Sequence, residues 1–365
     1  MRRRTGGIAI VLAFGLVAGL SLRQLWYLLD SRVPSRETAP SFAADERLAR
    51  PGAIKWRVDV GLWADQTPPG LGADDTVYVS GERYLHAIAK DGRVRWKVNA
   101  SGIAISRDGR LYTRRWPKAL VALNDDGSER WEVPTDIGWD SSLGGLAADD
   151  DGTILVALGS RIYRIDAEGA VRLTADVRPH MVSGPAMPGP EHTIYVTTMD
   201  RGGDDRVRAI GSDGRERWNV RAHVIRPPAV TFDGTFYTAW TELFRISPAG
   251  RIDWHRDLRG VAETPVARDD GTVFIAAGSD LLAFDAGGRL LWTFGAASTI
   301  HGPAFGADGT IFIAGESAYA LEPTGRERWQ VALSDRDDAQ FPPLVASDGT
   351  LIVQTSRNVY AIAPR

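Results

Sequence analysis

Short apolar runs separated by polar turn signals repeat along the chain from residue 53 to the end. In the clearest unit, Thr264–Ala267 is followed by Asp270-Gly271, apolar runs over 272–276 and 281–285, Gly287-Gly288 and a last run over 290–292. Runs this short, bounded by glycine and aspartate, predict four β-strands joined as an antiparallel meander. No amphipathic helical pattern competes with them after residue 52.

Asp-Gly pairs mark the turns of these units. Glycine adopts a positive φ without steric cost, and a tight hairpin turn requires that conformation. The pairs therefore predict hairpins at fixed places in each unit. At the first turn the aspartates are Asp108, Asp151, Asp233, Asp270, Asp308 and Asp348, and near the third turn they are Asp91, Asp126 and Asp213.

A tryptophan near the end of each unit sets the repeat length. Consecutive members of the series lie 35 to 40 residues apart, except for one gap of 87 residues that divides at Leu173. Because an indole can bury about 150–250 Å², one tryptophan per unit is expected to pack one unit against the next, and a cofactor cage is the less favoured interpretation. The series is Trp56, Trp96, Trp131, Trp218, Trp254, Trp292 and Trp329.

Units of about forty residues with four strands cannot bury both faces alone, so neighbouring units must stack. The last unit, from Phe341 to Arg365, contains three strands and stops before its tryptophan strand, which Ile54–Val58 would supply. Closure by a terminal strand is typical of a ring that protects its sheet edges. The pattern predicts an all-β fold over residues 53–365, an eight-bladed β-propeller of four-stranded antiparallel blades.

The N-terminus has a different pattern. Three arginines precede an uncharged run from Thr5 to Leu22, and Leu25–Leu29 follows Arg23. A basic start followed by an apolar stretch predicts a hydrophobic helix over residues 1–29, acting as a membrane anchor or as a signal segment cleaved near Val17-Ala18-Gly19. Residues 30–52 are expected to form a flexible tether. The propeller would then lie outside the cytoplasm, in the periplasm or the extracellular space.

Residues 270–292, Asp-Gly-Thr-Val-Phe-Ile-Ala-Ala-Gly-Ser-Asp-Leu-Leu-Ala-Phe-Asp-Ala-Gly-Gly-Arg-Leu-Leu-Trp, resemble the pyrroloquinoline-quinone (PQQ) enzyme repeat. The resemblance recurs over essentially all of residues 51–365. It implies an eight-bladed propeller of a kind shared by quinoprotein dehydrogenases and by non-catalytic envelope proteins similar to the scaffold of outer-membrane β-barrel assembly. Fold alone does not decide between these functions.

The chain departs from both groups because it contains no cysteine. Quinoprotein alcohol dehydrogenases carry an adjacent cysteine pair beside the cofactor and long insertions, and the assembly scaffold carries a lipidated cysteine. We therefore expect no catalytic residues and no cofactor. The alternatives are a PQQ-dependent oxidoreductase that uses calcium and a ligand-sensing propeller.

The net charge and the absence of known motifs argue against a nucleic-acid-binding protein and against a metal-binding protein. Residues 1–50 hold 8 of the 43 Lys/Arg and 4 of the 46 Asp/Glu, which leaves 35 against 42, or −7, for the rest. A nucleic-acid binder would need a basic stripe. The six histidines have no metal-ligand spacing, and Asp149-Asp150-Asp151 lacks the alternating acidic pattern of a calcium loop. We expect no metal site and no nucleic-acid partner.

One set of residues is predicted to form a ring at one mouth of the axial channel, because each lies two positions before a proline that leads into an inner strand. Arg226, Glu263 and His301 belong to consecutive units and would form a charged cluster. Such a ring is either a binding site for a peptide or small molecule, or the polar lining that any channel mouth needs. The ring is Thr67, Ser183, Arg226, Glu263, His301 and Phe341, with Gln66, Trp139, Asp140, His180, His223 and Gln340 nearby.

The sequence thus predicts a non-catalytic, membrane-tethered binding scaffold of the cell envelope, with protein or peptide partners. The partners would be held by the ring or by strand addition at the fourth unit. That unit is irregular, since Glu191-His192 replaces Asp-Gly and Met199–Asp205 lengthens a hairpin.

Overall fold

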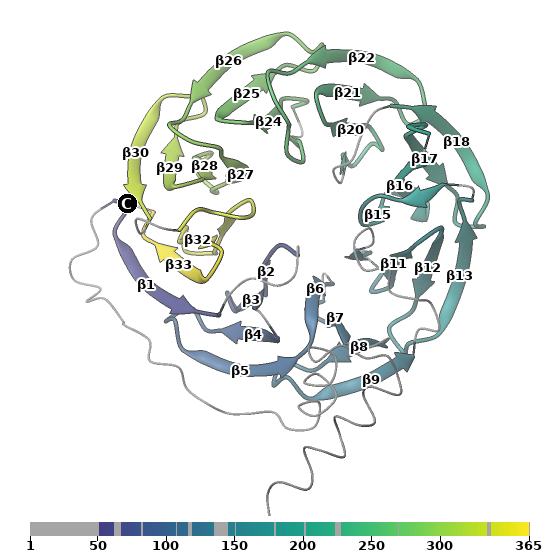
Figure 1. Cartoon of the computed structure of the whole chain (residues 1–365), viewed down its shortest axis with the longest axis horizontal. Coiled ribbons are helices and arrows are strands. Elements are labelled where there is room, and N and C mark those ends of the chain that lie inside the picture. The colour runs from purple at the N-terminus through teal and green to yellow at the C-terminus, as the bar shows by residue number, and fades with distance from the viewer. Residues whose placement is uncertain are drawn as a thin grey trace, which may run out of the picture.

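A computed structural model of the chain describes residues 51–61, 67–81, 83–106, 108–115, 119–134, 145–149, 151–178, 180–200, 202–222, 228–268, 270–333 and 337–364. Over these ranges the strands form eight separate antiparallel sheets arranged as blades around one axis (Figure 1). The all-β eight-bladed propeller predicted from the repeat is confirmed. The expected N-terminal helix and residues 30–50 of the expected tether lie outside the described residues. No helix within the described ranges is long and apolar enough to span a bilayer.

The first four blades follow each other along the chain. Blade one consists of β2 (Gly70–Leu71), β3 (Val77–Ser80), β4 (Tyr84–Ile88) and β5 (Val94–Asn99). Blade two consists of β6 (Ser101–Ile105), β7 (Leu111–Arg115), β8 (Ala119–Leu123) and β9 (Glu129–Pro134). Blade three consists of β10 (Leu146–Ala148), β11 (Ile154–Leu158), β12 (Arg161–Ile165) and β13 (Val171–Asp176). Blade four consists of β14 (Met181–Val182), β15 (Met187–Pro188), β16 (Ile194–Met199), β17 (Arg206–Ile210) and β18 (Glu216–Arg221).

The last four blades complete the ring. Blade five consists of β19 (Ala229–Val230), β20 (Phe236–Ala239), β21 (Glu242–Ile246) and β22 (Ile252–Asp257). Blade six consists of β23 (Val266–Ala267), β24 (Val273–Ala277), β25 (Asp280–Phe284) and β26 (Leu290–Gly295). Blade seven consists of β27 (His301–Phe305), β28 (Ile311–Ala314), β29 (Ser317–Leu321) and β30 (Glu327–Ala332). Blade eight consists of β31 (Leu344–Val345), β32 (Leu351–Gln354), β33 (Asn358–Ile362) and β1 (Ile54–Asp59).

Blade eight closes the ring with strands from both ends of the propeller. β1 pairs antiparallel with β33, with Trp56 opposite Ala361. The backbone amide of Gly52 also donates to the carbonyl of Ala363 at 3.1 Å. The predicted closure by Ile54–Val58 is confirmed, and it leaves no sheet of the ring without its outer strand.

The turns divide the propeller into two faces. In blade six the first turn spans 268–272 and the third spans 285–289, and each closes with a glycine of positive φ, Gly271 and Gly288. In an antiparallel meander the first and third turns lie at the same end of the strands, so we call this end of all blades the turn face. The second turns, such as 278–279, and the connections between blades lie at the other end, which we call the loop face.

Each tryptophan of the repeat contacts the following blade. Its indole Nε1 donates to a backbone carbonyl in the third turn of that blade, or, for Trp329, to the carbonyl of Pro364 beside the start of β1. In blade three Leu173 takes this place, and Gly214 of the next blade lies against it. The acceptors for Trp56, Trp96, Trp131, Trp218, Trp254, Trp292 and Trp329 are the carbonyls of Lys90, Asp125, Ala167, Pro248, Ala286, Pro323 and Pro364.

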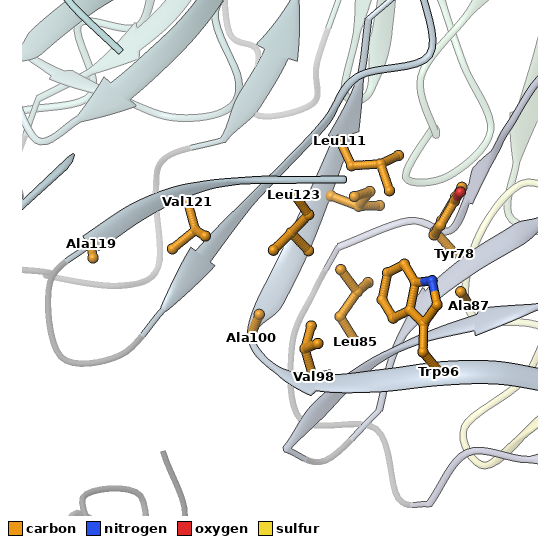
Figure 2. Close-up of a cluster of buried hydrophobic side chains, with 11 residues drawn as sticks. Tyr78, Leu85, Ala87, Trp96, Val98, Ala100, Leu111, Ala119, Val121 and Leu123 are labelled. Atoms are coloured by element: carbon orange, nitrogen blue, oxygen red, sulfur yellow. The ribbon is translucent and has the colours of Figure 1, made fainter. Parts of the chain in front are cut away.

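The apolar core lies between the blades. Figure 2 shows one such layer, where Trp96 and Tyr78 of blade one lie beside Leu111 and Leu123 of blade two. Every outer strand also carries a one-residue bulge directly before its tryptophan or Leu173. A bulge twists an exposed strand and hinders pairing with another chain.

Blade four is irregular where the sequence predicts. Its inner strand is divided into β14 and β15, which both pair with β16. The 3₁₀ turn at Pro190–His192 replaces the Asp-Gly turn, and Glu191 and His192 adopt φ values of 53° and 57°. Left-handed conformations at two successive residues with side chains are uncommon, because the Cβ atom crowds the backbone.

Candidate functional site

The segments that lead into the inner strands carry a set of structurally equivalent residues at the loop face. In three blades the backbone amide of this residue donates to a carbonyl in the second strand of the same blade. The acceptor is the fourth residue of that strand (β16, β24 or β32). In blade seven, His301 pairs directly with the corresponding Ala314. The three bonds run from Ser183 to Thr197 at 2.9 Å, from Glu263 to Ala276 at 2.8 Å and from Gln340 to Gln354 at 3.0 Å.

One member of the predicted ring is displaced by one residue. In blade eight the equivalent position belongs to Gln340 and not to Phe341, because Pro342-Pro343 adds a residue before β31. Phe341 is buried, with 9% of its surface exposed. Counting back from a proline cannot reveal this shift when two prolines are adjacent. The backbone bond to Gln354 does reveal it.

Glu263 and His301 lie together on blades six and seven. The Nδ1 atom of His301 is 3.4 Å from the Oε1 atom of Glu263. The side chain of His301 is 19% exposed and that of Glu263 is 16% exposed, so both are mostly buried and keep a small accessible surface. A partly buried carboxylate beside an imidazole can offer both a hydrogen-bond acceptor and a donor to a ligand.

The side chains of Thr67 and Ser183 form hydrogen bonds to residues of blades two and four. The Oγ1 atom of Thr67 accepts a long hydrogen bond of 3.4 Å from Nη2 of Arg114 in blade two. The hydroxyl of Ser183 donates to the hydroxyl of Thr197 at 2.9 Å and is buried. Both residues belong to the loop face, and these hydrogen bonds tie them to blades two and four.

His180 belongs to a separate network under the second turn of blade four. Its Nδ1 atom accepts a hydrogen bond of 2.8 Å from Nη2 of Arg208, and its Nε2 atom lies 3.3 Å from Asp204. A guanidinium can only donate, so Nδ1 carries no proton and Nε2 donates to Asp204. Arg208 also donates to Glu216 at 2.5 Å. His180 therefore supports blade four and does not join the predicted ring.

The remaining predicted members lie outside the described residues. They are Gln66, Trp139, Asp140, His223 and Arg226. The predicted contact of Arg226 with Glu263 stays a prediction.

Three groups of side chains bring possible metal ligands within 4.8 Å of one another, and two of them have other uses for those atoms. In the group of His180, Asp200 and Asp204, the Oδ2 atom of Asp204 already accepts a hydrogen bond of 2.8 Å from Nε of Arg206, and that positive charge opposes a metal cation. In the second group, the Oδ2 atom of Asp149 already lies 3.4 Å from the Arg164 guanidinium, whose positive charge opposes a second cation. The groups are His180, Asp200 and Asp204; Asp149, Asp151 and His192; and Glu242, His255 and Asp257.

Sequence reasoning missed the surroundings of His192. Its Nδ1 atom lies 3.4 Å from Asp151 and 3.5 Å from Asp149, and its carbonyl accepts a hydrogen bond from Arg164 at 2.8 Å. These contacts join the first turns of blades three and four. The signal available in the sequence was the replacement of Asp-Gly by Glu191-His192, which marks the turn but not its neighbours.

Comparison with known proteins gives one family. A family model described as outer membrane protein assembly factor BamB matches residues 45–138, 117–279 and 277–365. No curated protein sequence matches significantly.

Solved structures give the same fold. The chain is similar to BamB from Moraxella catarrhalis, with 18% identity, a TM-score of 0.64 and coverage of 89% of this chain and 98% of that one. It is also similar to the Dos1 propeller, with 9% identity, a TM-score of 0.66 and coverage of 84% and 94%. A virginiamycin B lyase from Staphylococcus aureus matches with 13% identity, a TM-score of 0.54 and coverage of 70% and 94%. At such identities the likeness concerns the fold alone.

Proposed function

The chain belongs to the outer membrane protein assembly factor BamB family, and from this membership we propose that it is a non-catalytic scaffold of the cell envelope. The family match over residues 45–365 is the observation that carries the proposal. The predicted hydrophobic segment at residues 1–29 would tether the propeller to a membrane, with the propeller outside the cytoplasm. Its partners would be envelope proteins or extended peptides.

The loop face is the proposed contact surface for these partners. Glu263 lies just before the inner strand β23 and His301 begins the inner strand β27, and 16% and 19% of their side-chain surfaces are exposed. Binding residues concentrate on loops that a rigid scaffold presents. Gln340 occupies the equivalent position on blade eight, so the three residues offer polar contacts from three consecutive blades.

A double substitution tests this surface. Glu263→Gln with His301→Gln removes the carboxylate and the imidazole but keeps hydrogen-bonding side chains of similar size. We expect proximity crosslinking in native membranes, read by mass spectrometry, to lose one specific envelope protein by about tenfold, which corresponds to 1.4 kcal/mol of binding free energy. Stability should change by less than about 1 kcal/mol, because both partners are replaced together and neither is left buried opposite an unpaired charge.

A matched variant separates this surface from general charge loss. Glu327→Gln removes one exposed carboxylate from the outer strand β30 and should leave all crosslinked proteins in place. Arg226→Gln tests the third member of the predicted cluster in the same assay. Equal crosslinking of every neighbour in the double variant and the parent would refute the role of Glu263 and His301.

A further inference from the structure

Exposed apolar side chains are concentrated on the turn face. Among the described residues, seven large hydrophobic side chains are exposed, and six of them lie at this end of the strands or in its turns. Four belong to the adjacent blades five and six. The four are Phe232 (97% exposed), Ile252 (37%), Leu290 (49%) and Leu291 (45%).

Leu291 occupies a position that is charged in the other blades. It is the bulged residue before the repeat tryptophan of blade six. Charge at an exposed strand edge normally prevents unwanted contacts, so an apolar residue here leaves the edge of blade six open to an apolar environment. The equivalent residues in blades one to five, seven and eight are Arg95, Arg130, Arg172, Arg217, Asp253, Arg328 and Lys55.

Phe232 projects from a turn that its neighbours hold in place. The Oγ1 atom of Thr231 donates to Asp233 at 2.6 Å, and the amide of Thr235 donates to the same carboxylate at 2.9 Å. The equivalent turn positions in blades seven and eight are Ala307 and Ser347. An aromatic ring that is almost fully exposed on a fixed turn is available for insertion into an apolar environment.

The outer parts of blades five and six form one continuous rim. The indole of Trp254 in β22 donates to the carbonyl of Ala286 at 2.9 Å, and Nε of Arg256 donates to Gly288 at 2.6 Å. The third turn of blade six therefore packs on the outer strand of blade five. Ile252 begins that strand, and Leu290 directly follows that turn.

Arginines form the outermost layer of this rim. Arg251 precedes Ile252 and is 81% exposed, whereas its partner Asp253 is 16% exposed. Arg289 precedes Leu290 and is 79% exposed, against 33% for Asp285. In both pairs the guanidinium is more exposed than its carboxylate. The first turns of the same blades also carry the exposed aspartates Asp233 and Asp270, so the arginines supply the positive part of a mixed-charge rim.

The chain enters the propeller on the same face. β1 begins at Ile54 beside the C-terminal residues Ala363 and Pro364, where the other blades have their third turn. The residues that precede β1 include the predicted tether at 30–52 and the predicted apolar helix at 1–29. The described part of the chain therefore enters β1 at the turn face, the same end of the strands that carries the exposed apolar side chains.

We propose that the turn face of blades five and six rests on an anionic phospholipid surface. Phe232, Ile252, Leu290 and Leu291 enter the headgroup region, and Arg251 and Arg289 contact lipid phosphates. Apolar side chains flanked by arginine are the composition that binds the membrane interface. The inference rests on the membrane tether in the proposed function. It leaves the opposite loop face free for protein partners.

The absence of cysteine allows a direct test, because one introduced cysteine can be labelled alone. The variants are Leu290→Cys on the rim and Val261→Cys on the loop face, where Val261 is 45% exposed. Each full-length protein carries a polarity-sensitive nitrobenzoxadiazole label and is reconstituted into vesicles of phosphatidylethanolamine and phosphatidylglycerol. We expect about a twofold or greater rise in fluorescence, with quenching by spin-labelled lipid, at position 290 and no change at 261.

Flotation of the vesicles separates this inference from the tether. If the protein floats with the vesicles but the label at position 290 keeps the emission of a water-exposed probe, the docking surface is overturned and the tether is supported. Protein that does not float overturns both. A label that becomes buried only when envelope proteins are added would assign the rim to a protein partner and also overturn the proposal.

The charge contribution has its own variant. Arg251→Gln with Arg289→Gln, made in the labelled Leu290→Cys protein, should reduce the response on anionic vesicles to that seen on phosphatidylcholine vesicles. Both arginines are highly exposed, so the substitution is not expected to disturb folding. An unchanged response would contradict the role assigned to lipid phosphates.

Discussion

Replacing Trp96 by alanine is expected to lower the free energy of unfolding by about 3–5 kcal/mol, the usual cost of deleting a buried indole. The side chain is 7% exposed, and its ring centroid lies 5.7 Å from that of Tyr78 (Figure 2). The Nε1 atom donates to the carbonyl of Asp125 in the next blade at 2.7 Å. The alanine variant would lose this contact and leave a cavity between two sheets.

Gly127 explains why the site cannot collapse around a smaller residue. Its φ is +81°, and a Cβ atom there would lie 2.7 Å from the Trp96 ring. The ring therefore lies directly on the backbone of the neighbouring blade, and no side chain is available there to fill the space.

Trp96→Phe provides the matched control. Phenylalanine keeps most of the buried aromatic surface but loses the hydrogen bond to Asp125, so a cost of about 1 kcal/mol is expected beyond the smaller ring volume. Urea denaturation followed by circular dichroism measures both variants against the parent. A loss below about 1 kcal/mol for Trp96→Ala would show that the repeated indole does not stabilise contacts between blades.

The blades could be predicted from the sequence because each signal is local and repeated. A single turn rule places glycine where φ is positive, as at Gly271 and Gly288. The closure by β1 could be predicted because the last unit has three strands and lacks a tryptophan strand. Ile54–Val58 is a tryptophan strand without a unit of its own. Leu173 could be placed by spacing alone, and it takes the position of a tryptophan against Gly214.

The candidate site could be predicted only in part, because its residues lie on the connections that do not repeat. The pairing of Glu263 with His301 follows from their equivalent positions on adjacent blades. The shift from Phe341 to Gln340 depends on one additional residue between the backbone bond of Gln340 to Gln354 and the start of β31. The place of His180 depends on Arg208, which approaches from another strand of blade four. No local pattern in the sequence encodes such contacts.

The two faces also could not be distinguished from the sequence. The positions of Leu290 and Val261 look alike as isolated apolar residues near charged ones. Only the topology puts Leu290 at the end where the chain enters and Val261 at the opposite end. Exposure then shows which apolar residues remain outside the core, and this combination carries the inference of a membrane-facing rim.

The stability of the propeller is expected to fall as the pH is lowered from about 7 to 4, and His86 is the cause. Burial, followed by the positive charge of Lys97 on the adjacent strand, lowers the pKa of His86 from 6.5 to about 4. Its Nδ1 atom is buried without a hydrogen-bond partner. The folded protein therefore prefers the neutral imidazole, because a proton there would be poorly solvated.

The sign follows from the two pKa values. Between pH 6.5 and about 4 the unfolded chain binds the proton and the folded protein does not, so protonation favours unfolding. The contribution of neutral His86 is complete above pH 6.5 and is lost as the pH falls toward 4, with a limit of about 3 kcal/mol. Carboxylates act at lower pH: the hydrogen bond from Thr310 and the charge of Arg328 lower the pKa of Asp308 to about 2.

His86→Gln is the variant that isolates this effect. Glutamine does not titrate, so the decline in unfolding free energy between pH 7 and 4.5 should be reduced by about 2 kcal/mol relative to the parent. His255→Gln is the control, because that imidazole is exposed on the outer strand β22, and it should retain the decline of the parent. Urea denaturation midpoints at pH 7, 5.5 and 4.5 measure all three proteins. Equal slopes for the parent and His86→Gln would remove His86 as the source of acid sensitivity and shift attention to the carboxylates.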